Sequence, residues 1–338
     1  MLKTRVRFPS PAPFPLRESP MNTDWRPLPV IDRCIATVGG LMLAVSAAAA
    51  PGALPSPLKD DPAYWRALVE DCPVPAGESA AALVREAIGF LGSPDTVWRD
   101  DIGYGVVAAC VYGQRRLSAD ERRTLVDSLS ANLERGIGNA GDDTVLLRSF
   151  SALDLSVFAA LELQVPALDE AGYRQLLDAA LEYLREERDL RGFDSRTGWI
   201  HATAHAADLL KFLARDPRFT RTDQERLLTA IRVRMTASAA PVFTHAEDER
   251  LAAVVLSVIR RGDFDAALLR PWLERFVRLE QDTWMETPPP ASALAASQNA
   301  RNLLKSLYVL SSMPTPEPTG GQVVAREAVL ETLQQIRR

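Results

Sequence analysis

The sequence has few of the residues on which most enzyme active sites depend. It contains three histidines and three cysteines among 338 residues. It has no Gly-rich phosphate loop, P-loop lysine or dinucleotide fingerprint, and no G-x-S-x-G elbow surrounds a serine. Aromatic residues make up 7% and do not cluster as they would for stacking on sugars or bases. These absences argue against nucleotide-dependent enzymes and the common serine hydrolases.

Positive charge is also scarce. The formal net charge is −5 at pH 7, and the surplus of acidic residues grows when the first 50 residues are set aside. Binding to nucleic acid needs cationic surface that displaces counterions from phosphates, so we expect no nucleic-acid partner.

The longest uncharged segment lies near the amino terminus. Residues 35–50 carry no charge and are too short to span a bilayer comfortably. Ala47 and Ala49 supply an A-x-A cleavage pattern, so the sequence predicts a signal peptide over 21–50. An uncleaved anchor or a buried hydrophobic helix is the alternative.

The residues before this signal do not fit an export sequence. Residues 1–20 are rich in proline and arginine, and Met21 gives the signal a conventional length. We therefore interpret 1–20 as a misassigned start and 51–60 as a linker. The expected location is the periplasm or the cell exterior, with no stable membrane span after cleavage.

Cleavage of the signal would leave two cysteines, Cys72 and Cys110. An oxidising compartment would permit a disulfide between them. Both lie in apolar helical surroundings, and two buried free thiols are the interpretation that we favour.

Helical periodicity pervades the rest of the chain. Apolar residues recur three and four positions apart, as in 81–91, and capping boxes are predicted at 118–121 and 222–225. Strand signals are nearly absent. The sequence predicts eleven or twelve helices in an all-α domain over 61–312, followed by a Pro-rich stretch and a terminal capping helix within 313–338.

Five of the expected helices share a register. The second position is a long polar residue in 98–107, 147–156, 200–209, 249–258 and 300–309. The unit is therefore a helix pair of about 50 residues, which resembles the HEAT and armadillo class. The predicted fold is an α-solenoid, a helical-hairpin repeat array of about five two-helix units.

The shared polar position predicts a groove along one inner surface, close to the amino termini of the five helices. The candidate groove residues are Trp98, Arg99, Asp100, Asp101, Tyr104, Arg148, Trp199, His201, His205, Asp208, Glu247, Asp248, Arg250 and Arg301. Such a groove would hold a peptide or a small anionic ligand. Alternatively, these residues form reciprocal salt bridges that lock adjacent repeats together.

Two of the three histidines stand four residues apart. His201 and His205 would lie one turn apart on a helix face that Asp208 shares, and His245 lies one repeat further on. These four residues are the candidate ligands of a divalent metal such as zinc, with an open position for catalysis. The zincin pattern requires glutamate where Ala202 stands. A metal-dependent hydrolase is therefore the alternative, and two structural histidines are the simpler interpretation.

Several motifs follow one another in an order that chance would rarely produce. They are LGSPD at 91–95, WRDD at 98–101, RSFS at 148–151, ERDLRG at 187–192, GWIHATAHAAD at 198–208 and EDERLA at 247–252. On these motifs the chain resembles the bacterial domain-of-unknown-function family numbered 2785, over about 78–285.

The resemblance implies a single helical domain whose polar residues coincide with the candidate groove. It implies no activity. It also implies a cytoplasmic protein without a leader, a pattern from which the signal-like segment departs. Because nothing in the sequence demonstrates catalysis, we favour a binding protein.

Overall fold

Helices make up almost all of the described structure. The computed structural model describes residues 59–237, 241–314 and 319–336, all within one compact unit, Ala53–Arg338. These residues contain twelve α-helices and a single two-stranded sheet. The all-α fold class predicted from the sequence is therefore confirmed.

Some predictions fall outside the described residues. The expected misassigned start at 1–20 and the signal peptide at 21–50 lie there, as do most of the linker and most of the Pro-rich stretch.

The first half of the described chain contains α1 (Pro62–Asp71), α2 (Ala80–Ile88), the π-helix η1 (Val97–Tyr104), α3 (Gly105–Val107), the π-helix η2 (Ala108–Gly113), α4 (Ala119–Leu133), α5 (Thr144–Glu162) and α6 (Glu170–Glu186). The second half contains β1 (Phe193–Asp194), β2 (Gly198–Trp199), α7 (Ala202–Leu213), α8 (Arg221–Thr236), α9 (Glu247–Ile259), the 3-10 helix η3 (Ala266–Leu268), α10 (Leu269–Thr283), α11 (Ala291–Ser312) and α12 (Gly320–Gln335).

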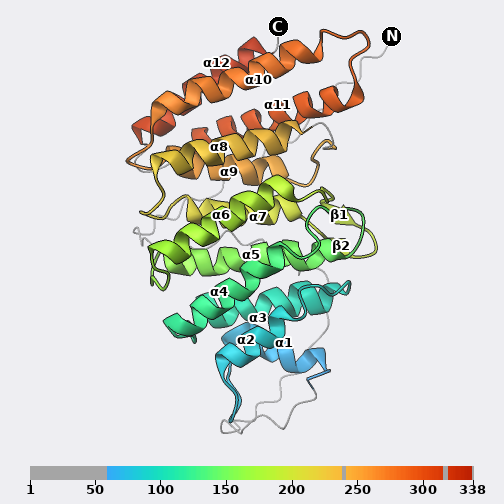
Figure 1. The fold of residues 1–338 in the computed structure, drawn as a ribbon, viewed down its shortest axis with the longest axis vertical. Helices are drawn as coiled ribbons and strands as arrows, with labels where there is room; N and C mark the ends of the chain where they lie inside the picture. The colour runs from blue at the N-terminus through green and yellow to red at the C-terminus, as the bar shows by residue number, and fades with distance from the viewer. Residues whose placement is uncertain (1–58, 238–240, 315–318, 337–338) are drawn as a thin grey trace, which may run out of the picture. The chain divides into compact units, whose positions relative to one another are not determined.

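Most of the helices lie in two rows (Figure 1). The inner row consists of α5, α7, α9 and α11, which pack against one another in that order, with η1 and η2 beside α5. The outer row consists of α4, α6, α8 and α10, which also pack in order. Because the chain alternates between the rows, residues about fifty apart in sequence become neighbours.

The helix α5 is the most apolar part of the inner row. By length and composition it could cross a membrane, but 83% of its apolar window is buried inside the fold. Phe150, Leu155 and Phe158 belong to the same hydrophobic core as Leu209 of α7. A helix that is apolar on all sides is expected at the centre of a core, so the few polar residues of α5 lie in a strongly desolvated environment.

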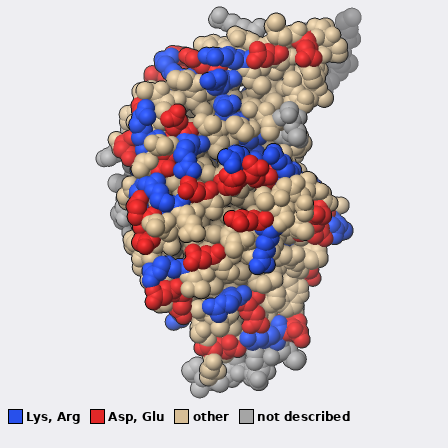
Figure 2. All heavy atoms as spheres, viewed as in Figure 1, with Lys and Arg blue, Asp and Glu red and all other residues tan. Residues whose placement is uncertain are grey.

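The outer row carries charges of both signs. Figure 2 shows lysines and arginines interspersed with aspartates and glutamates on the face that the outer helices form. Arg174 of α6 pairs with Asp223 of α8, and Arg226 of α8 pairs with Asp178 of α6. Exposed pairs such as the second contribute about 0–1 kcal/mol each, so this face favours solubility more than it stabilises the fold.

Side-chain caps begin several outer helices. Ser118 and Glu121 form the predicted capping box at α4. At α8 the box is formed by Thr220 and Asp223, so the prediction of a box at 222–225 is wrong. The helix begins earlier because the Asp223 carboxylate accepts the main-chain N–H of Thr220 at 2.8 Å.

A disulfide joins Cys72 to Cys110. It connects the end of α1 to η2, and both residues lie in the hydrophobic core. The prediction of two free thiols is therefore wrong, although both side chains are buried as expected. The pairing depends on α1 lying beside η2, which the spacing of the cysteines does not reveal.

Candidate functional site

The three histidines lie together near the starts of α7 and α9. His201 immediately precedes α7, His205 is in its first turns, and His245 lies just before α9. The ring centroid of His201 is 5.8 Å from that of His205 and 6.4 Å from that of His245. The structure thus brings His245 to a pair of histidines that precede it by about forty residues in the sequence.

Two exposed aromatic rings adjoin these histidines. The hairpin of β1 and β2 presents Phe193 and Trp199, which are 48% and 38% exposed. Trp199 stacks on His201, with ring centroids 4.4 Å apart and ring planes at 25°, and its centroid lies 5.8 Å from that of His245. We call Phe193, Trp199, His201 and His245 the aromatic face. Grouped exposed aromatic rings of this kind are typical of binding surfaces.

Gly192 allows the hairpin to lie directly on this face. A Cβ atom at this position would lie 2.6 Å from His245 Nδ1 and 2.6 Å from Glu247 Oε1. The Gly192 carbonyl also accepts the main-chain N–H groups of Ile200 and His201, at 3.0 and 3.1 Å. A side chain at position 192 would therefore displace the hairpin or His245.

The residues that precede α7 and α9 have left-handed backbones. The φ angle is 49° at His201 and 66° at Ala246, a region that costs a residue other than glycine about 1–3 kcal/mol. Neither helix start has a side-chain cap. A hydrogen bond of 2.9 Å between His201 Nε2 and the main-chain oxygen of His245 connects the two segments. Strain of this kind clusters at binding and catalytic sites.

Hydrogen bonds fix the tautomers of two histidines. A carbonyl oxygen only accepts, so His201 donates from Nε2 and keeps a lone pair on Nδ1. Ser149 donates to the carbonyl oxygen of Ile200 and accepts from His205 Nδ1, 2.8 Å away, which leaves the lone pair of His205 on Nε2. Burial lowers the pKa of His201 to about 4 and lowers that of His205 well below its usual range. Both rings are therefore neutral at pH 7, and each keeps one basic nitrogen.

Arg99, Phe150 and His205 form a layer across three neighbouring helices of the inner row. The guanidinium carbon of Arg99 lies 4.8 Å from the Phe150 ring centroid, and the His205 centroid lies 5.0 Å from it. Arg99 also donates to the carbonyl oxygens of Thr197 and Trp199, at 2.5 and 3.3 Å. We call these three residues the Phe150 layer. It connects η1, α5 and α7 to the hairpin.

A second layer follows one turn further along the same helices. Hydrogen bonds in a π-helix join residues five apart, so Tyr104 lies one turn beyond the arginine of the Phe150 layer. Asp154 and Asp208 follow the other two members by four and three residues, on the same faces of α5 and α7. Burial, and then the charges of Asp154 and Asp208, raise the pKa of Tyr104 to about 12. These three residues are the Asp154 layer.

The carboxyl group of Asp154 has no partner. The residue is fully buried, and neither side-chain oxygen makes a hydrogen bond within the described chain. Asp208, in contrast, binds Lys211 Nζ at 2.9 Å and also binds Arg250. Burial raises the pKa of Asp154 well above its usual range. An unpaired carboxyl in an apolar core costs stability, so its position calls for a functional explanation.

Four arginines of the candidate groove occupy the shared second position, and we call them the ridge arginines: Arg99, Arg148, Arg250 and Arg301. Two of them lie inside the protein. Arg99 and Arg148 are fully buried, so neither lines an open groove. Arg148 forms an ion pair of 2.7 Å with Glu187, which is itself 2% exposed. It also donates to the main-chain oxygens of Arg135 and Asn139, at 3.0 and 3.3 Å. Both arginines connect elements of the fold.

The other two ridge arginines also have partners. Arg250 of α9 binds Asp208 of α7, and Arg301 of α11 binds Glu280 of α10. These contacts resemble the salt bridges between neighbouring helices that were the alternative to a groove. They leave no ridge arginine without an acceptor.

The remaining candidate residues are dispersed around the two layers. Trp98 packs on a phenylalanine that follows α2, and Asp101 pairs with an arginine of α1. Asp248 accepts a hydrogen bond from a serine of α11. Glu247 accepts the main-chain N–H of His245 at 2.8 Å, and burial raises the pKa of Asp100.

The predicted metal ligands meet only in part. Within residues 59–237, 241–314 and 319–336, no three His, Cys, Asp or Glu side chains are arranged to hold a metal ion. Asp208 is occupied by two cationic side chains. His201 Nδ1 and His205 Nε2 keep free lone pairs, while the other nitrogen of each ring is bound to oxygen, as is usual for histidines that bind metals.

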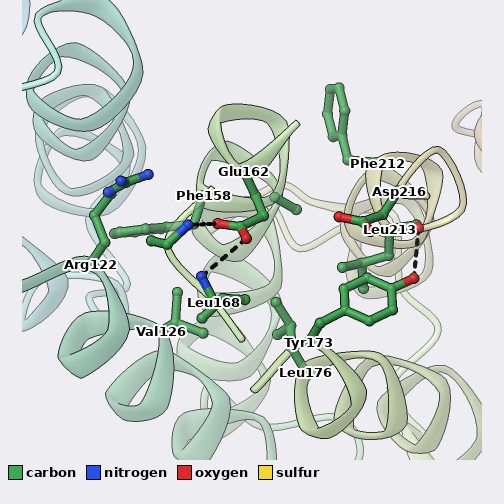
Figure 3. Close-up of a pocket in the computed structure, with 12 residues that line it drawn as sticks. Arg122, Val126, Phe158, Glu162, Leu168, Tyr173, Leu176, Phe212, Leu213 and Asp216 are labelled. Carbon is green, nitrogen blue, oxygen red and sulfur yellow. Dashed lines mark hydrogen bonds between the residues drawn. The ribbon is translucent and has the colours of Figure 1, made fainter. Parts of the chain in front are cut away.

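A small pocket lies towards the other end of α5 and α7. Figure 3 shows that side chains of α4, α5, α6 and α7 line it. Glu162 accepts the main-chain N–H groups of Ala167 and Leu168 at 2.8 and 3.0 Å, and Tyr173 donates to the Leu213 carbonyl oxygen at 3.0 Å. These polar groups already have partners, whereas Arg122 Nε of the same lining makes no hydrogen bond within the described chain.

Phe193 and Asp154 were not predicted from the sequence. Asp154 is the single charged residue between Arg148 and Glu162. A lone aspartate in a long apolar helix is rarely buried without a reason, so this signal was available. Phe193 gave no comparable signal, because its exposure depends on the hairpin.

The family relationship fits this site. Residues 133–309 match a family described as a protein of unknown function, DUF2785. The matched region contains the aromatic face and Asp154, although it begins later and ends later than the 78–285 expected from the motifs. No curated protein and no solved structure matches the chain. Because the match spans just over half of the sequence, the chain belongs to the DUF2785 family of proteins of unknown function.

Proposed function

We propose that this protein binds a peptide or a small molecule on the aromatic face. The observation that carries the proposal is the exposed Trp199 ring, which stacks on the neutral imidazole of His201. Aromatic rings that are rigid and exposed supply large contact area at little cost in conformational entropy. The hairpin that carries Trp199 is held by the carbonyl contacts of Arg99.

The aromatic face is not explained by the needs of the fold. It leaves two large aromatic rings exposed and includes a histidine with a left-handed backbone. Both features lower stability relative to a polar surface of ordinary geometry. Features that lower stability and occur at one place are expected where a protein binds a ligand.

The chemistry of the face favours a ligand that donates hydrogen bonds. His201 keeps an acceptor nitrogen on this face, the buried His205 keeps another behind it, and no ridge arginine lacks an acceptor. The anionic ligand expected from the ridge is therefore not part of this proposal. A ligand with a planar or apolar part and N–H or O–H donors fits the face better.

The proposed architecture is the α-solenoid expected from the repeat, with helix pairs of the inner and outer rows as its units. The proposed location is outside the cytoplasm. The disulfide between Cys72 and Cys110 supports that location, because such bonds persist in oxidising compartments.

Metal-dependent hydrolysis is the second candidate function. The observation that favours it is the fixed tautomer of His201 and of His205, each of which has an oxygen partner on one nitrogen and a lone pair on the other. A bound zinc ion would supply an activated water. Two imidazole ligands from the chain would leave coordination positions for that water and for a substrate.

The binding proposal is tested with a panel of tripeptides that combine aromatic, basic, acidic and amide side chains. Wild type is compared with Trp199→Ala and with Trp284→Ala, which removes an exposed tryptophan at the end of α10. We expect at least one peptide that binds wild type and Trp284→Ala equally and binds Trp199→Ala about tenfold or more weakly. Equal binding to all three proteins, or no binding at all, would contradict the proposal.

The metal proposal is tested by the zinc content of the purified protein, before and after reconstitution. The comparison is a double variant, His201→Asn and His205→Gln, with His245→Gln as control. Near-stoichiometric zinc that is lost only in the double variant would support a metalloprotein. Zinc that binds no better to wild type than to the double variant would exclude the hydrolase mechanism.

A further inference from the structure

We infer that the Asp154 layer is a subsite for a positively charged hydrogen-bond donor, an ammonium or guanidinium group. The inference rests on the proposed function, because the aromatic face would hold the rest of the same ligand. It specifies what that ligand carries at one end.

The position of the subsite follows from the register of three helices. Phe150 contacts Arg99 of η1 and His205 of α7. One turn further on, Asp154 faces the same two helices, and Tyr104 and Asp208 take the corresponding places. The Asp154 layer therefore adjoins the Phe150 layer, which itself holds the hairpin of the aromatic face.

The layer contains acceptors that lack donors. Neither carboxyl oxygen of Asp154 has a hydrogen bond to any described residue. The Tyr104 hydroxyl likewise makes none within the described chain. A guanidinium offers five N–H donors and an ammonium offers three, which is the complement that this layer lacks.

The cations around the layer are already engaged. Lys211 and Arg250 both bind Asp208, and Arg99 donates to main-chain carbonyl oxygens. None of them forms an ion pair with Asp154. A bound proton or an incoming cation can neutralise this carboxylate, and a cation also supplies charge-assisted hydrogen bonds.

The layer meets solvent at its edge. Asp154 is fully buried, but Tyr104 and Arg250 are partly exposed. A ligand group would therefore enter beside Tyr104. An anionic group would meet the carboxyl groups of Asp154, Asp208 and Asp100 there, so the same surface discriminates against acids.

Two peptides that differ in one charge test the inference. Acetyl-Phe-Arg-amide carries a guanidinium, and acetyl-Phe-citrulline-amide carries a neutral urea of the same shape. Wild type is compared with Asp154→Asn, which keeps the size of the side chain, and with Asp127→Asn, which removes an exposed carboxylate from α4. Calorimetry measures each affinity, and the thermal midpoint of each variant shows that it is folded.

We expect wild type and Asp127→Asn to prefer the arginine peptide by about tenfold or more, which corresponds to one charge-assisted hydrogen bond. Asp154→Asn should bind both peptides with equal, low affinity. Because burial raises the pKa of Asp154, binding should release more protons from wild type than from Asp154→Asn. Repeating the titration in two buffers of different ionisation enthalpy measures this release.

Failure of the inference differs from failure of the proposed function. An arginine preference that survives in Asp154→Asn, or a wild type that does not distinguish the peptides or binds neither of them, would overturn the cationic subsite. The proposed function fails separately, if Trp199→Ala binds its tripeptide ligands as wild type does.

Discussion

The helices α5 and α7 pass through two different environments. At their carboxyl ends, around the pocket of Figure 3, the carboxylates have partners: Glu162 and Asp216 bind Arg218 or main-chain groups. Arg122 Nε, in the same pocket, makes no hydrogen bond within the described chain. Away from these ends, Asp154 in the middle of α5 has no hydrogen-bond partner among the described residues, and His201 just before α7 has a left-handed backbone. The same two helices therefore carry carboxylates with partners near their carboxyl ends and, in the middle of α5, a carboxyl group without one among the described residues.

This difference distinguishes buried polar groups that stabilise the fold from those that are available to a ligand. Glu162 accepts two main-chain N–H groups and Arg218, so it completes a turn between α5 and α6. Asp154 completes nothing within the described residues. A buried polar group that serves the fold is expected to have its partners, whereas one that serves a ligand keeps acceptors free. The polar group best suited to bind a ligand is thus Asp154, which does not line the pocket of Figure 3.

The largest loss of stability is expected when the buried ion pair of Arg148 and Glu187 is broken. Glu187→Ala would leave Arg148 buried without its carboxylate, which should lower the free energy of unfolding by about 3–5 kcal/mol. Urea denaturation measures the change. The control is Glu182→Ala, which removes an exposed partner of Arg185 and should cost less than about 0.5 kcal/mol. Similar losses in the two variants would contradict the assignment of Arg148 to the fold.

The free energy of unfolding should depend on pH through His201 of the aromatic face. The pKa of His201 is lowered to about 4, so between pH 6.5 and 4 the unfolded state binds a proton that the folded state does not. Stability should therefore fall as the pH falls through this window, by at most about 1.4 kcal/mol per pH unit for this histidine. Urea titrations at pH 7, 5.5 and 4.5 measure the slope.

The variant His201→Asn should have a shallower slope over the same window, because asparagine does not titrate and tolerates a left-handed backbone. His245→Asn is the matched control, because it removes a neighbouring imidazole and leaves His201 in place. An unchanged slope in His201→Asn would place the pH dependence elsewhere.

A smaller effect is expected where the hairpin lies on the histidines. In Gly192→Ala the new Cβ would meet His245 and Glu247 at 2.6 Å, which should lower stability by about 1–3 kcal/mol and displace the aromatic face. Gly262→Ala is the control, because a Cβ at that position meets nothing within 4 Å. Thermal unfolding compares the two, and equal midpoints would show that the hairpin yields without cost.

Much of the fold could be predicted from the sequence, because it depends on local periodicity. Helical periodicity predicted the all-α class, and the capping box of Ser118 and Glu121 predicted the start of α4. The proximity of His245 to His201 also followed from the repeat. These features depend on sequence spacing alone.

Other features depend on contacts between distant elements. The burial of Arg148 requires Glu187 opposite it, and the disulfide of Cys72 requires η2 beside α1. The π-helical geometry that places Tyr104 beside Asp154 is likewise not encoded in a simple period. An arginine predicted to line a groove was therefore found inside the protein.

The most direct test of the central claim compares two buried aspartates, Asp154 in the middle of α5 and Asp216 just beyond the carboxyl end of α7. Asp216→Leu removes one of the two carboxylate partners of Arg218, which keeps Glu162, and should lower the free energy of unfolding by about 1–3 kcal/mol. Asp154→Leu removes a carboxyl without partners and should leave stability unchanged or raise it by up to about 2 kcal/mol. Opposite outcomes in the same urea titration are the predicted result. An equal loss in both variants would show that Asp154 serves the fold and would contradict the account.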